Sequence, residues 1–192
     1  MLTQKTALAY VIGVALGDGN LSNPNGRAPR LRVTCDSKYP KVAQEISKNL
    51  RFLFPNNQTS IVKRSKENTY FDISVYSTLL PKWMPWKIGG GPKITQKLRV
   101  PKWIRTKRSL SSACLRGLLQ TDGSIYRDRG YLMVNFCNHS QSPAADVLAM
   151  LTALGFKPTW HTTGTKQGRI KYTVRIARNA EMMVRELGLF KK

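Results

Sequence analysis

The sequence predicts an α+β protein made of two similar halves, each with the order helix, strands, helix, strands, helix. A short segment near the N-terminus recurs in mid-chain at an offset of 104 residues, which is the sign of an internal repeat. Similar alternating and amphipathic segments follow each copy in the same order. With 192 residues and 41% hydrophobic content, the chain can also bury a core in one large domain or two small ones.

The repeat is clearest in two apolar segments that both end in Asp-Gly. Residues 9–19 read AYVIGVALGDG, and residues 113–123 read ACLRGLLQTDG. Small residues recur every fourth position in both copies, a spacing that places them on one face of a helix. Such a face lacks the bulk that keeps helix axes roughly 8–10 Å apart, so we expect the two helices to pack closely together. The alternative is that each small-residue face packs only on its own sheet.

The segments after each copy predict the remaining elements. In the first half we expect a strand at 30–35, a helix at 40–54, strands at 58–64 and 69–76 joined by a turn around Glu67-Asn68, and a short helix at 77–84. In the second half we expect strands at 131–138, 158–163 and 170–177 and helices at 142–155 and 179–187. Hairpin partner strands are expected near 20–28 and 124–129.

A stretch rich in Pro, Gly and Lys separates the two halves. It contains three consecutive glycines at 89–91, and glycine runs form flexible connectors. We therefore predict an N-terminal half at residues 1–86, a linker at 87–103 and a C-terminal half at 104–192.

The net charge predicts a polyanionic partner. The formal charge is +22, from 32 Lys and Arg against 10 Asp and Glu. Residues 1–96 carry 14 basic and 5 acidic side chains, and residues 97–192 carry 18 and 5. Because Lys and Arg displace the counterions condensed on phosphate, we expect both halves to contact a nucleic acid. A basic protein without such a partner is the alternative.

Cysteine usage and hydropathy indicate the compartment. Three cysteines without a CxxC pair favour neither a disulfide framework nor a zinc site, and they fit a reducing intracellular environment, the cytoplasm of a prokaryote or an organelle. The apolar N-terminal segment resembles a signal peptide, but its copy lies in mid-chain, where no signal peptide can be. No apolar run approaches the roughly 18 residues of a membrane span, so no membrane partner is expected.

An aspartate ends each repeated helix, at Asp18 and Asp122. The glycine after each is expected to stop the helix in a left-handed conformation. A carboxylate at a helix C-terminus faces the negative end of the dipole, which costs about 0.3–1 kcal/mol, and a divalent cation would reverse this penalty. If the C-termini lie side by side, the two carboxylates can hold metal ions at the attacking and leaving oxygens of a phosphodiester. Two plain Asp-Gly turns are the alternative.

Residues 11–19 (VIGVALGDG) and 115–123 (LRGLLQTDG) resemble the two nine-residue motifs of LAGLIDADG homing endonucleases, and residues 100–104 (VPKWI) resemble the usual lead-in to a second motif. The resemblance covers essentially the whole chain. It implies a single-chain monomer of two pseudo-twofold-related αββαββα halves, each a curved antiparallel sheet with helices on one face, joined through the two packed motif helices.

The resemblance also implies an activity. The chain would be an intron-encoded, site-specific homing endonuclease that makes a staggered double-strand break in a long DNA target by metal-dependent phosphodiester hydrolysis. Mg²⁺ is the implied cofactor, Mn²⁺ a substitute, and Ca²⁺ an ion that supports binding without cleavage. An RNA maturase that assists splicing of its host intron, with intron RNA as partner, is one alternative. A cleavage-dead DNA-binding regulator of the same fold is another, although both motif acids are retained, which favours cleavage.

The resemblance assigns metal binding to the carboxylates of Asp18 and Asp122, with the backbone carbonyls of Gly17 and Thr121 as further ligands. These residues occupy the final positions of the two motifs.

Three further residues are implied near the reacting groups. Asp36 and Asn138, at the end of the strand after each motif, are expected near the attacking water. Arg178, near the end of the last strand, is expected to polarise the scissile phosphate. The first half offers only Ser77 or Thr78 there, with Lys82 a helical turn later, so the two half-sites are expected to cut at unequal rates.

Outward-facing strand positions are expected to contact DNA. Two-stranded ribbons fit the major groove, where Arg reads guanine and Asn reads adenine, while many of the contacts go to phosphate. The predicted positions are Arg30, Arg32, Lys63 or Arg64, Tyr70, Asp72, Ser74 and Tyr76 in the first half and Arg127, Arg129, Asn135, Lys171, Thr173 and Arg175 in the second.

Overall fold

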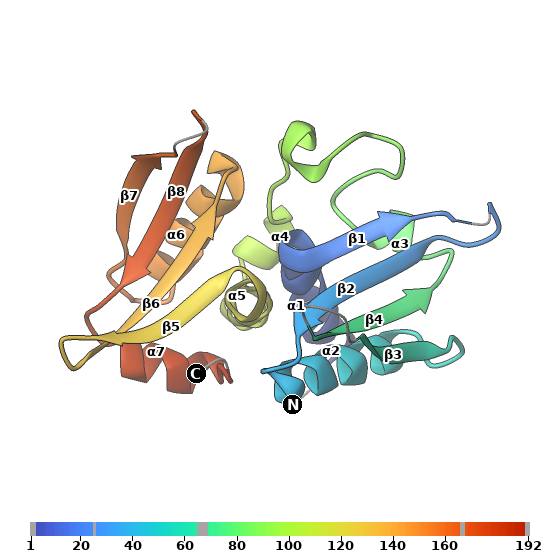
Figure 1. Ribbon diagram of the computed structural model, residues 1–192, viewed down its shortest axis with the longest axis horizontal. Helices are drawn as coiled ribbons and strands as arrows, with labels where there is room; N and C mark the ends of the chain where they lie inside the picture. Colours follow the sequence, from blue (N-terminus) through green and yellow to red (C-terminus); the bar gives the residue numbers. More distant parts are fainter. Residues whose placement is uncertain (1–2, 25, 65–68, 166–167, 191–192) are drawn as a thin grey trace.

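The computed structural model describes residues 3–24, 26–64, 69–165 and 168–190, and its elements form two sets of the same order (Figure 1). The first set is α1 (Gln4–Asp18), β1 (Gly19–Ser22), β2 (Arg30–Asp36), α2 (Pro40–Leu53), β3 (Thr59–Arg64), β4 (Tyr70–Tyr76) and α3 (Leu80–Trp83). The second is α5 (Arg108–Thr121), β5 (Gly123–Asp128), β6 (Tyr131–Asn138), α6 (Gln141–Ala153), β7 (Thr159–Gly164), β8 (Ile170–Ile176) and α7 (Ala180–Leu187). A 3-10 helix, η1 (Lys93–Gln96), and α4 (Lys102–Arg105) lie between them.

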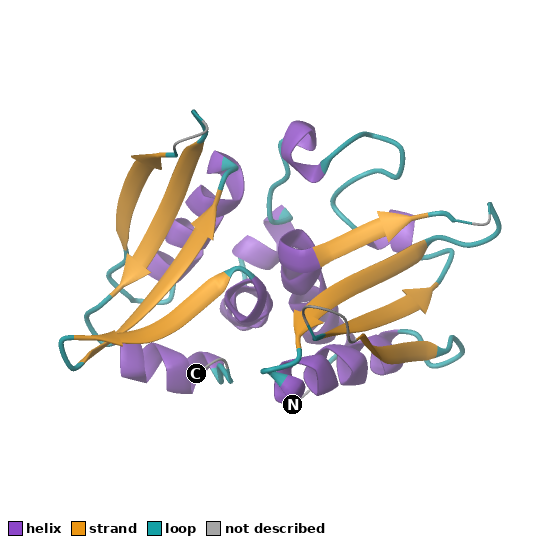
Figure 2. Cartoon of the chain, in the orientation of Figure 1, coloured by secondary structure: helices purple, strands orange, loops and turns teal. Residues whose placement is uncertain are grey.

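Each set forms one four-stranded antiparallel sheet. The strand orders are β1-β2-β4-β3 and β5-β6-β8-β7, so the second sheet repeats the topology of the first. Helix α2 covers one face of the first sheet, and α6 and α7 cover one face of the second (Figure 2). The two αββαββα halves of the predicted α+β fold are thereby confirmed. The predicted turn around Glu67-Asn68 lies outside the described residues, and the proposed domain boundaries stay a prediction.

The strands follow the alternating pattern from which they were predicted. In β2, Leu31 and Val33 are fully buried, whereas Arg32 and Thr34 point to the opposite face. The same alternation in β8 buries Val174 and leaves its neighbours on the outer side. Each sheet therefore has one apolar face under its helices and one polar face on the opposite side.

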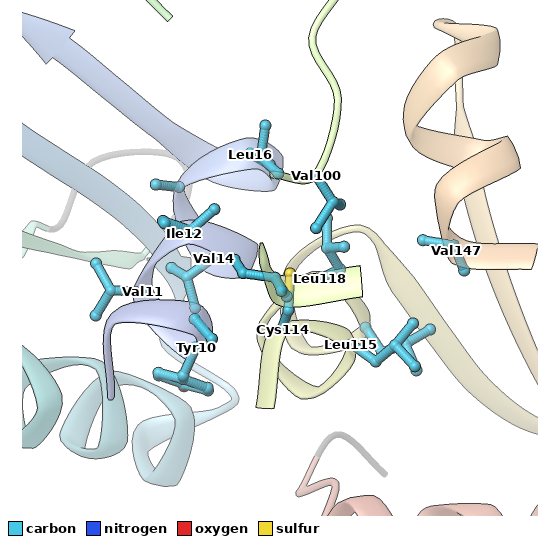
Figure 3. Packing of buried hydrophobic residues seen from close by; sticks show 14 of the residues in the cluster. Tyr10, Val11, Ile12, Val14, Leu16, Val100, Cys114, Leu115, Leu118 and Val147 are labelled. Atoms are coloured by element: carbon cyan, nitrogen blue, oxygen red, sulfur yellow. The ribbon is translucent and has the colours of Figure 1, made fainter. Parts of the chain in front are cut away.

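Helix α1 is buried on nearly every side. Residues 9–16 are all buried, and a helix that is apolar all round belongs in the interior of a protein. It lies beside α5 at the centre of the molecule, between the two sheets (Figure 1). Figure 3 shows Val14 of α1 directed toward Cys114 and Leu118 of α5. The burial of Cys114 raises the pKa of its thiol far above the ordinary range.

Two glycines allow the backbones of α1 and α5 to touch. A Cβ on Gly13 would collide with the carbonyl oxygen of Cys114, and a Cβ on Gly117 would collide with that of Tyr10. The contact is reciprocal, since each glycine meets the backbone of the other helix. The prediction of close packing through small residues is confirmed.

A buried polar network also joins the two halves. The hydroxyl of Tyr10 donates to Gln120 Oε1 at 2.7 Å, and Gln120 Nε2 donates to Glu45 Oε2 at 3.0 Å. Arg116 Nη2 lies 2.8 Å from the other oxygen of Glu45. Burial raises the pKa of Tyr10 well above its usual value, so its hydroxyl stays a donor. Because an unmatched buried polar group is costly, this network fixes how the helices face each other.

No helix among the described residues combines the length and apolar content needed to cross a membrane.

The helix contact makes a testable prediction about stability. Gly13→Ala should lower the free energy of unfolding by about 3 kcal/mol, because the added methyl group forces two backbones apart. Gly164→Ala is the matched control: Gly164 has no left-handed φ, an added Cβ meets nothing within 4 Å, and stability should change by less than about 1 kcal/mol. Urea unfolding measures both, and equal stability of the two variants would contradict the packing described.

Candidate active site between the two motif helices

The C-terminal ends of α1 and α5 touch each other. A Cβ placed on Gly17 would lie 2.8 Å from the Thr121 Cβ and 3.4 Å from the carboxyl carbon of Asp122. Asp18 follows Gly17 directly, so the two motif aspartates sit at the same junction. Asp18 is exposed and Asp122 is half-buried, which makes their surroundings unequal.

The glycine after each aspartate is not a left-handed helix stop, contrary to the prediction. Gly19 is extended, with φ −80° and ψ 143°, and Gly123 also lacks a positive φ. Steric hindrance explains why both positions are glycine. A Cβ on Gly19 would collide with Ala15, and a Cβ on Gly123 would collide with Leu119, each one turn earlier in its helix. The chain thus passes straight from each helix into the first strand of its sheet, which places the junction where both sheets begin.

A lysine from the linker reaches the end of α1. Lys93 Nζ donates to the carbonyl oxygens of Ala15 at 3.1 Å, Leu16 at 3.1 Å and Gly17 at 2.5 Å. Desolvation lowers the pKa of Lys93, while its attraction to Asp122 and Asp18 opposes that shift. The sequence analysis missed Lys93, because the linker lacks a repeated copy that would single it out.

Asn138 is directed at the second aspartate. Its Nδ2 donates to Asp122 Oδ2 at 3.1 Å, and its Oδ1 accepts from the backbone N–H of Ser140 at 2.8 Å. The two bonds fix the amide plane and hold one oxygen of the Asp122 carboxylate. A hollow of about 290 Å³ opens beside them, with Lys93 and His139 among its lining residues.

The sheet registers correct the pairing of Asp36 with Asn138. Gly19 pairs with Val33, and the corresponding Gly123 pairs with Phe136. Counting three residues onward from each partner matches Asp36 with His139, one position later than predicted. Strands β2 and β6 end at positions that are not equivalent in register, Asp36 and Asn138, which hides this shift in the sequence.

Asp36 and His139 have their own local contacts. The Asp36 carboxylate accepts from the backbone N–H of Lys38 at 2.9 Å, and His139 Nδ1 lies 3.1 Å from the carbonyl oxygen of Ile170. The surroundings of the two aspartates therefore differ between the halves, as the sequence predicted, although the residues responsible are partly different ones.

The fold separates Arg178 from the aspartates. Phe136 pairs with Gly123 on one side and with Val174 on the other, and Arg178 lies four residues beyond Val174, away from Asn138. Strand β8 ends at Ile176, so Arg178 lies in the turn beyond its far end. Arg178 thus lies at the end of the sheet that is away from the junction of the aspartates. The prediction that it polarises the scissile phosphate is therefore wrong. Antiparallel pairing reversed the direction that the sequence argument assumed.

The polar face of the first sheet gathers most of its predicted contact residues. The pairs Arg30 with Tyr76, Arg32 with Ser74 and Arg64 with Tyr70 lie on the side opposite the helices. Asp72, on the same face, accepts from Thr34 at 3.0 Å and lies 3.7 Å from Arg64. Lys63 pairs with Phe71 and shares the helix-covered face, so Arg64 rather than Lys63 belongs to this surface.

The polar face of the second sheet carries a hydrogen-bonded row. Arg175 Nε donates to Asn135 Oδ1 at 3.3 Å, and Asn135 Nδ2 donates to Tyr126 at 3.0 Å. Thr173 and Lys171 continue this face along β8. The sequence analysis did not single out Tyr126, whose register position opposite Met133 places it on this face.

Arg127 lies on the wrong side for the predicted DNA contact. It pairs with Leu132, and its guanidinium lies 3.2 Å from Glu181 of α7, on the helix-covered side. Arg129 occupies the turn between β5 and β6 with a left-handed φ of 48°. The geometry of the β5–β6 hairpin determines on which side of the sheet Arg127 and Arg129 lie, and the sequence alone does not predict that geometry.

The linker forms hydrogen bonds and ion pairs with both halves. It is therefore a fixed segment and not the flexible connector that the sequence predicted. The buried carboxylate of Asp146 in α6 accepts from Arg99 Nη2 at 2.6 Å and from the Val100 N–H at 2.8 Å. Arg105 adds a charge 3.7 Å from the same carboxylate. Together with Lys93 on α1, these bonds hold the segment across the junction.

The donor set at the junction suits a hard divalent cation. Carboxylate and carbonyl oxygens are the preferred ligands of Mg²⁺ and Ca²⁺, and both kinds meet here. The carbonyls at the end of α1 already accept a cationic ligand, the Lys93 ammonium. Among the described residues, no group of three or more His, Cys, Asp or Glu gathers at one point, so any ion here would rely on backbone and substrate oxygens.

Comparison with protein families matches residues 109–186 to the LAGLIDADG-like domain. The match begins within α5 and ends in α7, so it covers the second motif and its sheet.

Solved structures extend the similarity to the whole chain. The homing endonuclease I-DmoI in complex with DNA and Mn has a TM-score of 0.67 at 21% identity, over 96% of this chain and 97% of that chain. I-DmoI in complex with DNA and Ca has a TM-score of 0.66 at 20% identity, over 96% and 88%. Full-length DUF199/WhiA from Thermatoga maritima has a TM-score of 0.68 at 12% identity, over 100% of this chain and 58% of that chain. No curated protein matches the chain in sequence. The LAGLIDADG resemblance and fold are thus confirmed.

The linker anchor predicts a stability effect. Asp146→Asn should lower the free energy of unfolding by about 2–3 kcal/mol, because it removes charge-assisted hydrogen bonds from a buried carboxylate. Glu181→Gln is the control, since its ion pair with Arg127 is 65% and 62% exposed and should contribute less than about 1 kcal/mol. Urea unfolding compares the two, and an unaffected Asp146→Asn variant would mean that the linker is not anchored there.

Proposed function

We propose that the chain is a site-specific DNA endonuclease that hydrolyses one phosphodiester bond in each strand of a long duplex target and leaves a staggered break. The observation that carries the proposal is the contact between the ends of α1 and α5, which brings Asp18 and Asp122 to one junction between two polar sheet faces. A duplex lying along both faces would present its two strands to this junction. The charge of +22 supports a nucleic-acid partner.

The chemistry follows from the residues at the junction. Asp18 and Asp122 would bind Mg²⁺, with Mn²⁺ as a substitute and Ca²⁺ supporting binding alone, and the carbonyls of Gly17 and Thr121 would complete the protein ligands. Bound there, the metal would supply a nucleophile at neutral pH and neutralise charge on the leaving oxygen. Asn138 orients Asp122 through its hydrogen bond. On the other side, Asp36 is the proposed neighbour of the attacking water.

A DNA-binding regulator without cleavage is the second candidate. The fold is as similar to DUF199/WhiA as it is to the homing endonuclease I-DmoI, so overall shape alone does not establish cleavage. Both motif aspartates are present, at the ends of two helices that touch, and this favours cleavage. No observation specifically favours an RNA maturase. A single chain supplies both halves of the site, which supports a monomer.

The aspartates give the direct test of cleavage. Asp18→Asn and Asp122→Asn should each lower double-strand cleavage at least about a thousandfold, because metal-assisted hydrolysis needs both carboxylates. The target is first recovered by digesting genomic DNA in Mg²⁺ and sequencing the new ends, and it is then cloned. Binding to this target in Ca²⁺ should stay intact in both variants.

Asp128→Asn, at the far end of β5, is the matched control and should cut normally. The absence of any new ends from the parent protein, with tight binding to DNA, would contradict the endonuclease and support the regulator. Parallel loss of DNA binding in the aspartate variants would mean that the acids are structural.

The corrected sheet faces predict which arginines bind DNA. Arg175→Ala should weaken binding to the cloned site by about 1–3 kcal/mol and reduce the salt slope of log K by about one, since Arg175 lies on the polar face. Arg127→Ala should leave the affinity within about twofold, because its guanidinium pairs with Glu181 behind the sheet. Fluorescence anisotropy at several salt concentrations measures both. Equal losses would refute the assignment of the two faces.

A further inference from the structure

We propose that the Lys93 ammonium is a tethered cation that occupies the divalent-ion position at the end of α1, so that a metal ion binds this half of the site only by displacing it. The inference rests on the proposed metal-dependent function but makes a claim of its own. The claim is that Lys93 leaves the end of α1 when a metal ion binds there, and that this happens at the α1 end of the site and not at the α5 end.

The Lys93 ammonium is coordinated by backbone oxygens, as a metal ion would be. Lys93 donates to the carbonyl oxygens of Ala15, Leu16 and Gly17, which uses all three of its N–H groups. The carbonyl of Gly17 is also one of the metal ligands proposed above. An ammonium ion and a divalent ion compete for such oxygens, since both are cations that need oxygen lone pairs.

The second argument is the contrast between the two helix ends. Thr121 occupies in α5 the position of Gly17 in α1, and its hydroxyl donates to the carbonyl oxygens of Gly117 and Leu118, both at 3.1 Å. These two carbonyls lie one turn back in the helix and correspond to Gly13 and Val14 of α1. Lys93 donates instead to the last carbonyl oxygens of α1, those of residues 15–17. The hydroxyl on α5 is neutral and bonds within its own helix, whereas the final carbonyls of α1 hold a cation.

The third argument is that Lys93 is held in place by the linker fold. Gln96 of η1 donates to the carbonyl oxygens of Lys87 and Gly91 at 3.2 and 2.9 Å and accepts from the Lys87 N–H at 3.0 Å. The ammonium lies 5.6 Å from the ring centre of the buried Trp86. A folded loop thus presents the lysine to the junction, unlike a solvated surface lysine.

Charge gives the displacement its driving force. Lys93 attracts both Asp18 and Asp122 and offsets part of their negative charge. A divalent ion carries twice that charge and would replace the ammonium, and DNA phosphate would favour the divalent ion further by adding negative charge. Displacement would release Lys93 and its loop at the edge of the site.

The test is the affinity of Lys93→Met for Mn²⁺ without DNA, measured by the EPR signal of the free ion. Methionine keeps the length of the side chain and removes the charge. If Lys93 holds the position most of the time, its loss should tighten Mn²⁺ binding about tenfold, the factor by which a competing closed state reduces apparent affinity. Lys87→Met, an exposed lysine of the same loop, is the matched control and should bind like the parent.

A second measurement uses the unaltered protein. Acetylation of Lys93, followed by mass spectrometry, should be slow in EDTA and about tenfold faster at saturating Mn²⁺, whereas Lys87 should react equally in both. Unchanged Mn²⁺ affinity in Lys93→Met, no Mn²⁺ binding in either protein, or unchanged acetylation of Lys93 would each overturn the inference. Cleavage of DNA is scored separately, so an active endonuclease with any of these results would retain the proposed function and lose only the displacement.

Discussion

The backbones of α1 and α5 touch at Gly13 and Gly117, where neither helix has room for a Cβ atom. This contact sets the distance between the two halves, because each helix leads directly into the first strand of its own sheet. The same approach brings Gly17 against Thr121 and Asp122 at the helix ends. The position of the site and the spacing of the two polar sheet faces therefore depend on one steric condition. A larger residue at either central glycine would change both together.

The electrostatics of the junction oppose that packing. Two helix C-termini and two carboxylates meet there, and each contributes negative charge. Lys93 offsets part of it at the α1 end, and Asn138 donates to Asp122 at the other end. In a protein with 32 basic residues, two of the ten acidic residues thus lie where they repel each other. Such an arrangement costs stability unless it binds a cation, which is the physical reason for assigning function to this point.

The repeat and the alternating strands predicted the fold because they are local patterns that burial enforces. Both sheets, the helix order and the contact of the motif helices could be derived from them. The predictions that were wrong concern residues whose positions depend on strand register and on long-range contacts. The hairpin registers make His139, and not Asn138, equivalent to Asp36. Antiparallel pairing places Arg178 away from the site. Lys93 could not be found at all, because only the folded linker brings it to α1.

The central claim is that Asp18 and Asp122 form one composite site across the helix contact. A double-mutant cycle on Mn²⁺ affinity, with Asp18→Asn, Asp122→Asn and both together, tests it most directly. A composite site predicts that either substitution alone removes most of the affinity and that the second adds little, a coupling of more than about 1 kcal/mol. Additive losses, with each variant retaining half of the bound Mn²⁺ at unchanged affinity, would show two independent sites and contradict the account.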